Sequence, residues 1–95
     1  MAEAEIEVRN PSGLHARPAA AFVRAAGGFS ADVRVINLTR DGREANAKSV
    51  LGVMGLGVAQ GHRIRIAAEG VDAADAVARL TALVAAGLGE EIAGT

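Results

Sequence analysis

The sequence contains no cysteine, tryptophan or tyrosine, and two phenylalanines are its only other aromatic residues. Without cysteine the chain can form neither a disulfide framework nor a cysteine-ligated zinc site, which favours the reducing cytoplasm as its compartment. Its two histidines, His15 and His62, have no carboxylate cluster beside them in the sequence. We therefore expect no metal site, and nothing in the sequence calls for a cofactor.

Strong charge of either sign is also missing. Ten Lys and Arg residues face eleven Asp and Glu residues, for a formal net charge of -1. Binding to nucleic acid draws on accumulated positive charge and on exposed rings that stack against bases, so we expect no nucleic-acid partner. Phe22 and Phe29 are both expected in the core.

Long apolar runs are absent as well. No stretch reaches the ~20 uninterrupted apolar residues that a membrane span needs, and the first ten residues, MAEAEIEVRN, lack the basic start and apolar run of a signal peptide. We expect a cytoplasmic protein without membrane insertion. The 95 residues fit one domain over residues 1–95, with a core from about residue 3 to residue 90.

The hydrophobic pattern predicts an α+β fold. Alternating apolar residues indicate strands, and apolar residues at helical spacing indicate helices. Asp72 and Asp75 resemble a capping box at the start of a long final helix, whose apolar stripe runs from Val77 to Leu88, and residues 90–95 are expected to fray. The predicted order is strand, helix, strand, strand, short helix, strand, helix, over residues 4–8, 16–26, 31–38, 43–47, from Ser49, 62–68, and 73 onward.

His15 lies between a Pro-Ser-Gly turn and the first turn of the first predicted helix. The positive end of the helix dipole favours the neutral imidazole, which can attack a phosphoryl group. Backbone N–H groups of Ala16 and Arg17 and the Arg17 guanidinium could then hold the phosphate, while Gly13 would leave room for an incoming donor. The same residues also fit an ordinary polar histidine in a loop, and local chemistry leaves both readings open.

Two motifs, GLHARPA at residues 13–19 and NAKSVLGVMGLG at residues 46–57, strongly resemble HPr, the phosphocarrier of the bacterial phosphoenolpyruvate-dependent sugar phosphotransferase system. The resemblance covers roughly residues 3–90. It implies an open-faced β-sandwich (βαββαβα), in which three helices cover one face of a four-stranded antiparallel sheet. It also implies a phosphocarrier that is not itself an enzyme.

The resemblance also assigns roles to individual residues. It implies that phospho-enzyme I phosphorylates His15 on Nδ1, that Arg17 stabilises the phosphate, and that the group passes to enzyme IIA domains. Ser49 matches the regulatory serine that an HPr kinase/phosphorylase modifies in carbon catabolite regulation. The residue type also fits a helix N-cap, and the two roles are compatible. Leu51 and Met54 match an apolar patch that docks partners.

The sequence is also compatible with several alternative functions. The carrier could serve a nitrogen-related or dihydroxyacetone-related phosphotransferase pathway. A ferredoxin-like module that binds a small ligand would have a similar element order and would not need His15. A pure interaction protein would need only Ser49 and the apolar patch, and the presence of His15 argues against it. No feature of the sequence indicates oligomerisation, so a monomer is expected.

Overall fold

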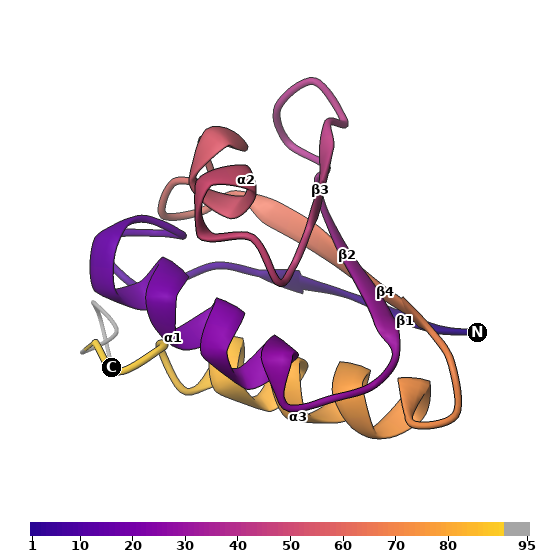
Figure 1. Ribbon diagram of the computed structural model, residues 1–95. Helices are drawn as coiled ribbons and strands as arrows, with labels where there is room; N and C mark the ends of the chain where they lie inside the picture. The colour runs from indigo at the N-terminus through magenta and orange to yellow at the C-terminus, as the bar shows by residue number, and fades with distance from the viewer. Residues whose placement is uncertain (91–95) are drawn as a thin grey trace.

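The computed structural model describes residues 1–90 and has the predicted order of elements (Figure 1). These residues form four strands and three helices, with β2 and β3 in direct succession, and none of the helices is long and apolar enough to cross a membrane. The elements are β1 (Ala2–Glu7), α1 (Ala16–Gly27), β2 (Asp32–Asn37), β3 (Glu44–Asn46), α2 (Val50–Gly55), β4 (Arg63–Glu69) and α3 (Ala73–Ala85).

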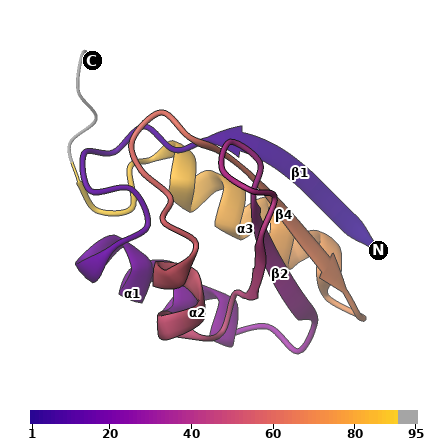
Figure 2. The same ribbon diagram turned by 90° about the horizontal axis from the view of Figure 1, so that it is seen from above.

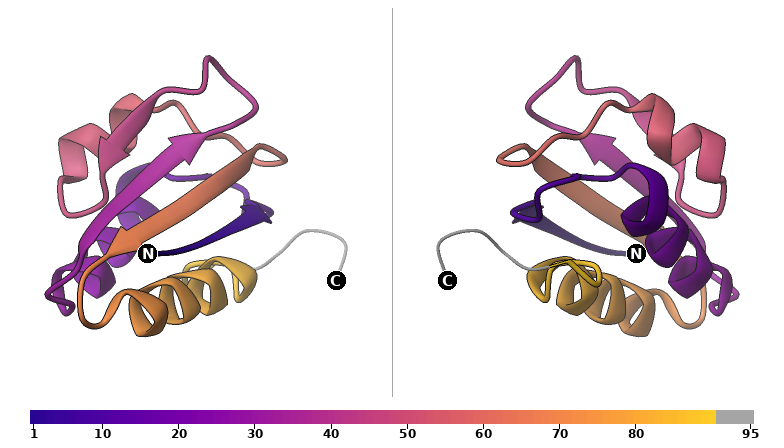
Figure 3. Two further views of the ribbon diagram at one scale, coloured as in Figure 1. Left: turned by 90° about the vertical axis from the view of Figure 1, so that its right-hand side faces the viewer. Right: turned by 90° about the vertical axis from the view of Figure 1, so that its left-hand side faces the viewer.

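The four strands form one antiparallel sheet in the order β1-β4-β2-β3. Its register sets Ile6 opposite Ile64, and Val35 opposite Ile66, on the face that is covered. The three helices lie on this face, α1 and α3 side by side beneath the sheet and α2 next to α1 (Figures 1 and 3). The predicted α+β fold, a four-stranded antiparallel sheet covered by three helices, is confirmed.

The opposite face of the sheet carries charged side chains of both signs. Glu3, Glu5 and Glu7 of β1 are exposed there, and Arg65 of β4 pairs with Glu5 at 2.8 Å. The two side chains of this pair remain about two-fifths exposed, so the pair contributes little to stability. Because charged side chains are well solvated, this face of the sheet can remain uncovered.

The core is built from small aliphatic residues and one aromatic ring. Phe22 of α1 is fully buried, whereas Phe29, also expected in the core, is only half-buried at its edge. Both helices contribute buried alanines, Ala19 and Ala26 from α1 and Ala73 and Ala76 from α3. The largest fully buried apolar side chains are Phe22, Leu14, Ile64, Ile66, Leu80, Val8, Val33, Val35, Val53 and Val84.

The last helix ends earlier than its apolar stripe predicted. Helix α3 stops at Ala85, and Leu88 is buried from the turn that follows rather than from the helix. Gly87 and Leu88 have positive φ angles of 92° and 54°, which reverse the chain, and the Leu88 N–H donates to the Leu83 carbonyl at 3.0 Å. The expected fraying is wrong for Glu90, which makes several hydrogen bonds, and residues 91–95 lie outside the described residues.

Asp72 does not form the predicted capping box. Its side chain makes no cap bond to α3 and instead accepts hydrogen bonds from the Ser30 and Ala31 N–H groups, both at 2.8 Å. Nearby, the Lys48 Nζ donates to the Phe29 carbonyl at 2.7 Å. The capping prediction was wrong because the turn that precedes β2 supplies competing donors that are distant in the sequence.

Because these bonds favour the charged carboxylate, the N–H of Ser30 above all, the pKa of Asp72 lies below its usual value. A lowered pKa adds stability above the ordinary Asp pKa, and this stability is lost as the pH falls through the lowered value. We predict that Asp72→Ala is less stable than the wild type at pH 7 and that the difference shrinks toward pH 2, measured by urea unfolding. Asp75→Ala, which removes an exposed carboxylate from the same helix turn, serves as the control, and an equal effect there would contradict the prediction.

Candidate functional site

His15 stands at the start of α1 with its side chain exposed. Its backbone is extended (φ −138°, ψ 154°), and it occupies the N-cap position without donating or accepting a cap bond through its ring. The imidazole is therefore available for chemistry rather than committed to closing the helix. The sequence placed the start of the helix at this residue, which the structure confirms.

The residue after His15 has an unusual backbone. Ala16 has φ +50°, a left-handed conformation that costs a non-glycine residue ~1–2 kcal/mol. Such residues are concentrated at functional sites. Arg17 follows, exposed on the first turn of α1, and Pro18 is buried beneath it. A left-handed residue followed by a helical one directs successive N–H groups into a shared concavity, which suits an anion.

Gly13 is required for a different reason from the expected one. It does not leave space for a donor, because it is buried against the backbone of Val58. A Cβ added to Gly13 would collide with the Val58 carbonyl oxygen, and φ is +60°. The next residue, Leu14, is buried and donates its N–H to that same oxygen at 3.1 Å. The close backbone contact thus fixes the chain just before His15.

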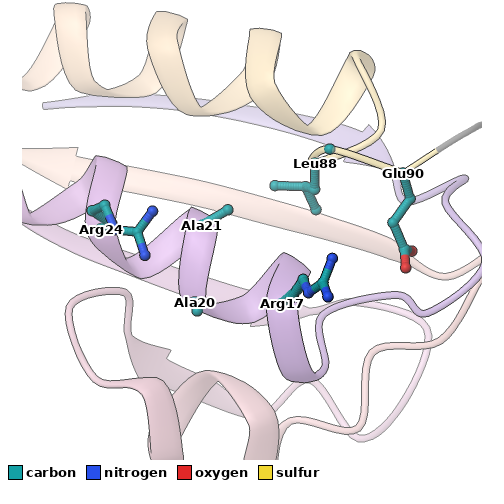
Figure 4. A pocket seen from close by; sticks show the side chains of 7 residues that line it. Arg17, Ala20, Ala21, Arg24, Leu88 and Glu90 are labelled. Atoms are coloured by element: carbon teal, nitrogen blue, oxygen red, sulfur yellow. The ribbon is translucent and has the colours of Figure 1, made fainter.

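A surface groove of about 330 Å³ lies beside the first two turns of α1. Arg17 and Arg24 line it from the helix, and residues 88–90 close it from the turn after α3. Figure 4 shows Arg17 and Glu90 at the same end of the groove, with Arg24 farther along α1. The remaining lining residues are Ala20 and Ala21.

Ser49 is the N-cap of α2. Its Oγ accepts a hydrogen bond from the Gly52 N–H at 3.0 Å, which satisfies one of the free donors of the first turn. The predicted capping role is confirmed. Ser49 as a residue is half-buried.

The apolar residues of α2 divide between the core and the surface. Val53 is fully buried, while Leu51 is 84% exposed and Val50 is 39% exposed. Met54 is half-buried beside the core. Helix α2 packs against α1, so these side chains and the start of α1 belong to neighbouring elements (Figure 2). An exposed leucine and a partly exposed methionine, three residues apart on α2, form a small apolar surface of the kind that binds partners.

His62 is half-buried. Its Nδ1 accepts the Ala59 N–H at 3.2 Å and lies 3.4 Å from the Asn37 Nδ2, so it organises the turn before β4. Within residues 1–90 no group of three or more His, Asp or Glu side chains is arranged to hold a metal ion.

Two further residues, Asn10 and Glu90, support the loop before His15 and have little or no signal in the sequence. Asn10 is fully buried, and its Nδ2 donates to the Gly13 carbonyl and to the Glu90 Oε1, both at 2.9 Å. The only local signal for Asn10 is a polar residue before a proline at a turn. Glu90 carries no local signal, because eighty residues separate it from Asn10.

Comparison with known proteins agrees with this geometry. The family model for the PTS HPr component phosphorylation site matches residues 2–86. The crystal structure of HPr-C-His from Thermoanaerobacter tengcongensis has a TM-score of 0.89 and 44% identity, over 97% of this chain and 100% of that one. The crystal structure of an HPr dimer from the same organism has a TM-score of 0.72 and 44% identity, over 95% and 100%.

Two relatives differ in size. The multiphosphoryl transfer protein of Escherichia coli O157:H7 is 46% identical over 87 residues, which are 92% of this chain but only 23% of that protein. The HPr-like protein Crh of Bacillus subtilis (strain 168) is 43% identical over 84 residues, 88% of this chain and 95% of Crh. This chain therefore spans about a quarter of the larger relative.

Together these matches define the class as the phosphocarriers of the phosphotransferase system. Within it, the chain belongs to the HPr family.

The contact between Gly13 and Val58 predicts the effect of an added methyl group. Gly13→Ala should cost more stability than the ~1–2 kcal/mol of a left-handed alanine alone, because Cβ also collides with a carbonyl oxygen. Gly42→Ala is the matched control, since Gly42 has φ +62° and open space around the added carbon. Denaturant unfolding of both variants measures the difference, and equal losses would show that the collision relaxes freely.

Proposed function

We propose that this protein accepts a phosphoryl group on His15 from phospho-enzyme I and passes it to enzyme IIA domains. The observation that carries the proposal is the exposed imidazole of His15, which starts α1 without serving as its side-chain cap and has Arg17 two residues on. An acceptor that two partners must reach in turn needs this exposure. The carrier works in the cytoplasm and requires no cofactor of its own.

The transfer is an exchange between two nitrogens. The lone pair of the His15 Nδ1 attacks phosphorus while the bond from phosphorus to the donor's histidine nitrogen breaks, and that nitrogen keeps the bonding electrons. A phosphorus-nitrogen bond is formed as one is lost, so the step is readily reversible. The second transfer, to enzyme IIA, repeats the exchange with His15 as the donor.

The start of α1 supplies groups that hold the phosphate. The N–H groups of Ala16 and Arg17 belong to the first turn, where no intrahelical acceptor is available to them. The left-handed Ala16 supports their convergence on one anion. The Arg17 guanidinium adds a charge-assisted contact, and its exposure allows it to move toward the phosphate.

Leu51 and Met54 are proposed to dock both partners beside His15. The apolar side chain of Leu51 is almost fully exposed to a partner, and the flexible side chain of Met54 can adapt to different surfaces. A charge at Ser49 would sit on the same helix. Phosphorylation there by an HPr kinase/phosphorylase would add a charge of about −2 to the docking surface and weaken transfer from enzyme I.

The proposal also covers the pathway that the carrier serves and its oligomeric state. We infer a sugar pathway, and a nitrogen-related or dihydroxyacetone-related carrier would use the same His15 chemistry. A monomer presents His15 to partners without hindrance, although the relative from Thermoanaerobacter tengcongensis is described as a dimer. A pure interaction protein would have no use for the exposed His15.

The principal prediction concerns His15. With enzyme I, Mg²⁺ and phosphoenolpyruvate, the intact mass of the wild type should rise by one acid-labile phosphoryl group, and His15→Ala should show no gain. Arg17→Ala should be phosphorylated about tenfold or more slowly, because a hydrogen bond to a charged group contributes about 1.5–3 kcal/mol. No gain in the wild type, with an enzyme I that phosphorylates another HPr, would refute the proposal.

A second prediction separates docking from chemistry. Leu51→Ala and Ser49→Asp should raise the KM for phosphorylation by enzyme I severalfold and change kcat much less, since neither residue touches the transferred group. Val71→Ala removes a similarly exposed side chain from the turn before α3 and should change neither constant. Loss of kcat with unchanged KM would contradict the docking role. A stable gain of one phosphoryl group on kinase treatment, absent in Ser49→Ala, tests the modification itself.

A further inference from the structure

The carboxylate of Glu90 holds the loop that precedes His15. Its Oε1 accepts the Asn10 Nδ2 at 2.9 Å and the Ser12 N–H at 3.0 Å, and its Oε2 accepts the Ser12 hydroxyl at 2.8 Å. Three donors from one short loop thus converge on a single side chain some eighty residues away in the sequence. In Figures 1 and 2 the end of the described chain lies beside this loop.

The backbone that carries Glu90 is itself anchored. Leu88 is buried and directs the turn after α3 back toward the core, and the Glu90 N–H donates to the Gly87 carbonyl at 2.8 Å. The carboxylate therefore reaches the loop from a fixed turn. Its bonds to Asn10 and Ser12, and the charge of Arg17 across the groove, lower the pKa of Glu90, so the carboxylate is ionised at neutral pH.

The loop is also held from its other side. Gly13 packs against the Val58 backbone, and Leu14 donates to the Val58 carbonyl. Glu90 thus completes a clamp around residues 10–14, directly before His15. Without it, the Asn10 and Ser12 side of the loop would lose all three of these bonds, and the angle at which the chain enters α1 would be less constrained.

We propose that Glu90 is a positioning residue for phosphoryl transfer, which orients His15 by binding Asn10 and Ser12. This inference rests on the proposed function of His15. Glu90 is not a catalytic residue, since its carboxylate acts through the loop. Misplacement of a reacting group by about 1 Å can slow a reaction up to about 100-fold, so a loosened loop has a measurable cost.

Charge and position predict opposite effects for Glu90. A carboxylate across the groove from Arg17 competes with the phosphate for that guanidinium, so removing its charge alone should leave transfer unchanged or make it faster. Removing the bonds should make transfer slower. Glu90→Gln keeps an acceptor for Asn10 and the Ser12 N–H, and its amide can donate to the Ser12 hydroxyl oxygen. Glu90→Ala removes both the charge and the bonds.

The test compares these two variants with the wild type in phosphorylation by enzyme I and phosphoenolpyruvate. We expect Glu90→Ala to lower kcat about tenfold with little change in KM, and Glu90→Gln to stay within about twofold of the wild type. Glu69→Ala, which removes an exposed carboxylate at the end of β4, is the control and should behave as the wild type. Thermal unfolding of each variant establishes that it is folded at the assay temperature.

A spectroscopic readout follows the bond itself. The ¹H and ¹⁵N shifts of the Ser12 amide should titrate in acid in the wild type, as protonation weakens the carboxylate as an acceptor, and this transition should be absent in Glu90→Gln. It needs no activity and remains measurable if Glu90→Ala does not fold. A Ser12 amide that titrates identically in both proteins would overturn the proposal.

The kinetic outcomes separate the two proposals. If the wild type is phosphorylated and Glu90→Ala is equally fast, the positioning role is wrong and the function of His15 stands. If Glu90→Gln is as slow as Glu90→Ala, the charge matters rather than the bonds, and the positioning role is again wrong. If the wild type is not phosphorylated at all, the proposed function fails, and the role of Glu90 in transfer fails with it.

Discussion

The position of His15 depends on the contact between two stretches of backbone, residues 8–14 and residues 58–62. The first stretch leaves β1 and the second precedes β4, and hydrogen bonds join them at both ends. Val8 exchanges bonds with His62 and Gly61 at 2.8 and 2.7 Å. Gly13 and Leu14 press against Val58 at the other end. Leu14 is buried and His15 is exposed, so the chain emerges from the core at the residue proposed to react.

Helices α1 and α2 have different roles in the proposed function. Helix α1 begins with the proposed acceptor and its arginine, whereas α2 offers an apolar surface. Six residues are too few for a helix to be stable alone, so α2 depends on its Ser49 cap and on the burial of Val53 and Leu56. Leu51 lies on the exposed side of α2, while Val53 and Leu56 hold the helix to the core.

Charge near the site is local rather than global. The chain has a formal net charge of -1, yet Arg17 and Arg24 line one groove beside α1. Recognition of a phosphoryl group requires positive charge only where the group is held. Salt screens the interaction between exposed charges that are more than about 10 Å apart. The open face of the sheet, by contrast, mixes acidic and basic side chains such as Glu5 and Arg65. A nearly neutral chain can therefore still place two arginines beside α1.

The sequence by itself determined the elements and the position of His15. Alternation in residues 2–8 and 63–69, and the Pro and Gly residues around the helices, encode local preferences that survive in the fold. The cap at Ser49 is equally local, since its partner Gly52 lies three residues away.

Only the tertiary structure decided which distant groups meet. Asp72 leaves its own helix for the Ser30 and Ala31 N–H groups, Leu88 reaches the core from a turn, and Glu90 binds the loop before His15. Gly13 faces a carbonyl that is forty-five residues away in the sequence. Each of these contacts forms when packing brings separate segments together, and a hydrogen-bonding group then binds the nearest partner in space. The periodicity and spacing of residues along the chain therefore do not indicate which of these distant groups pair.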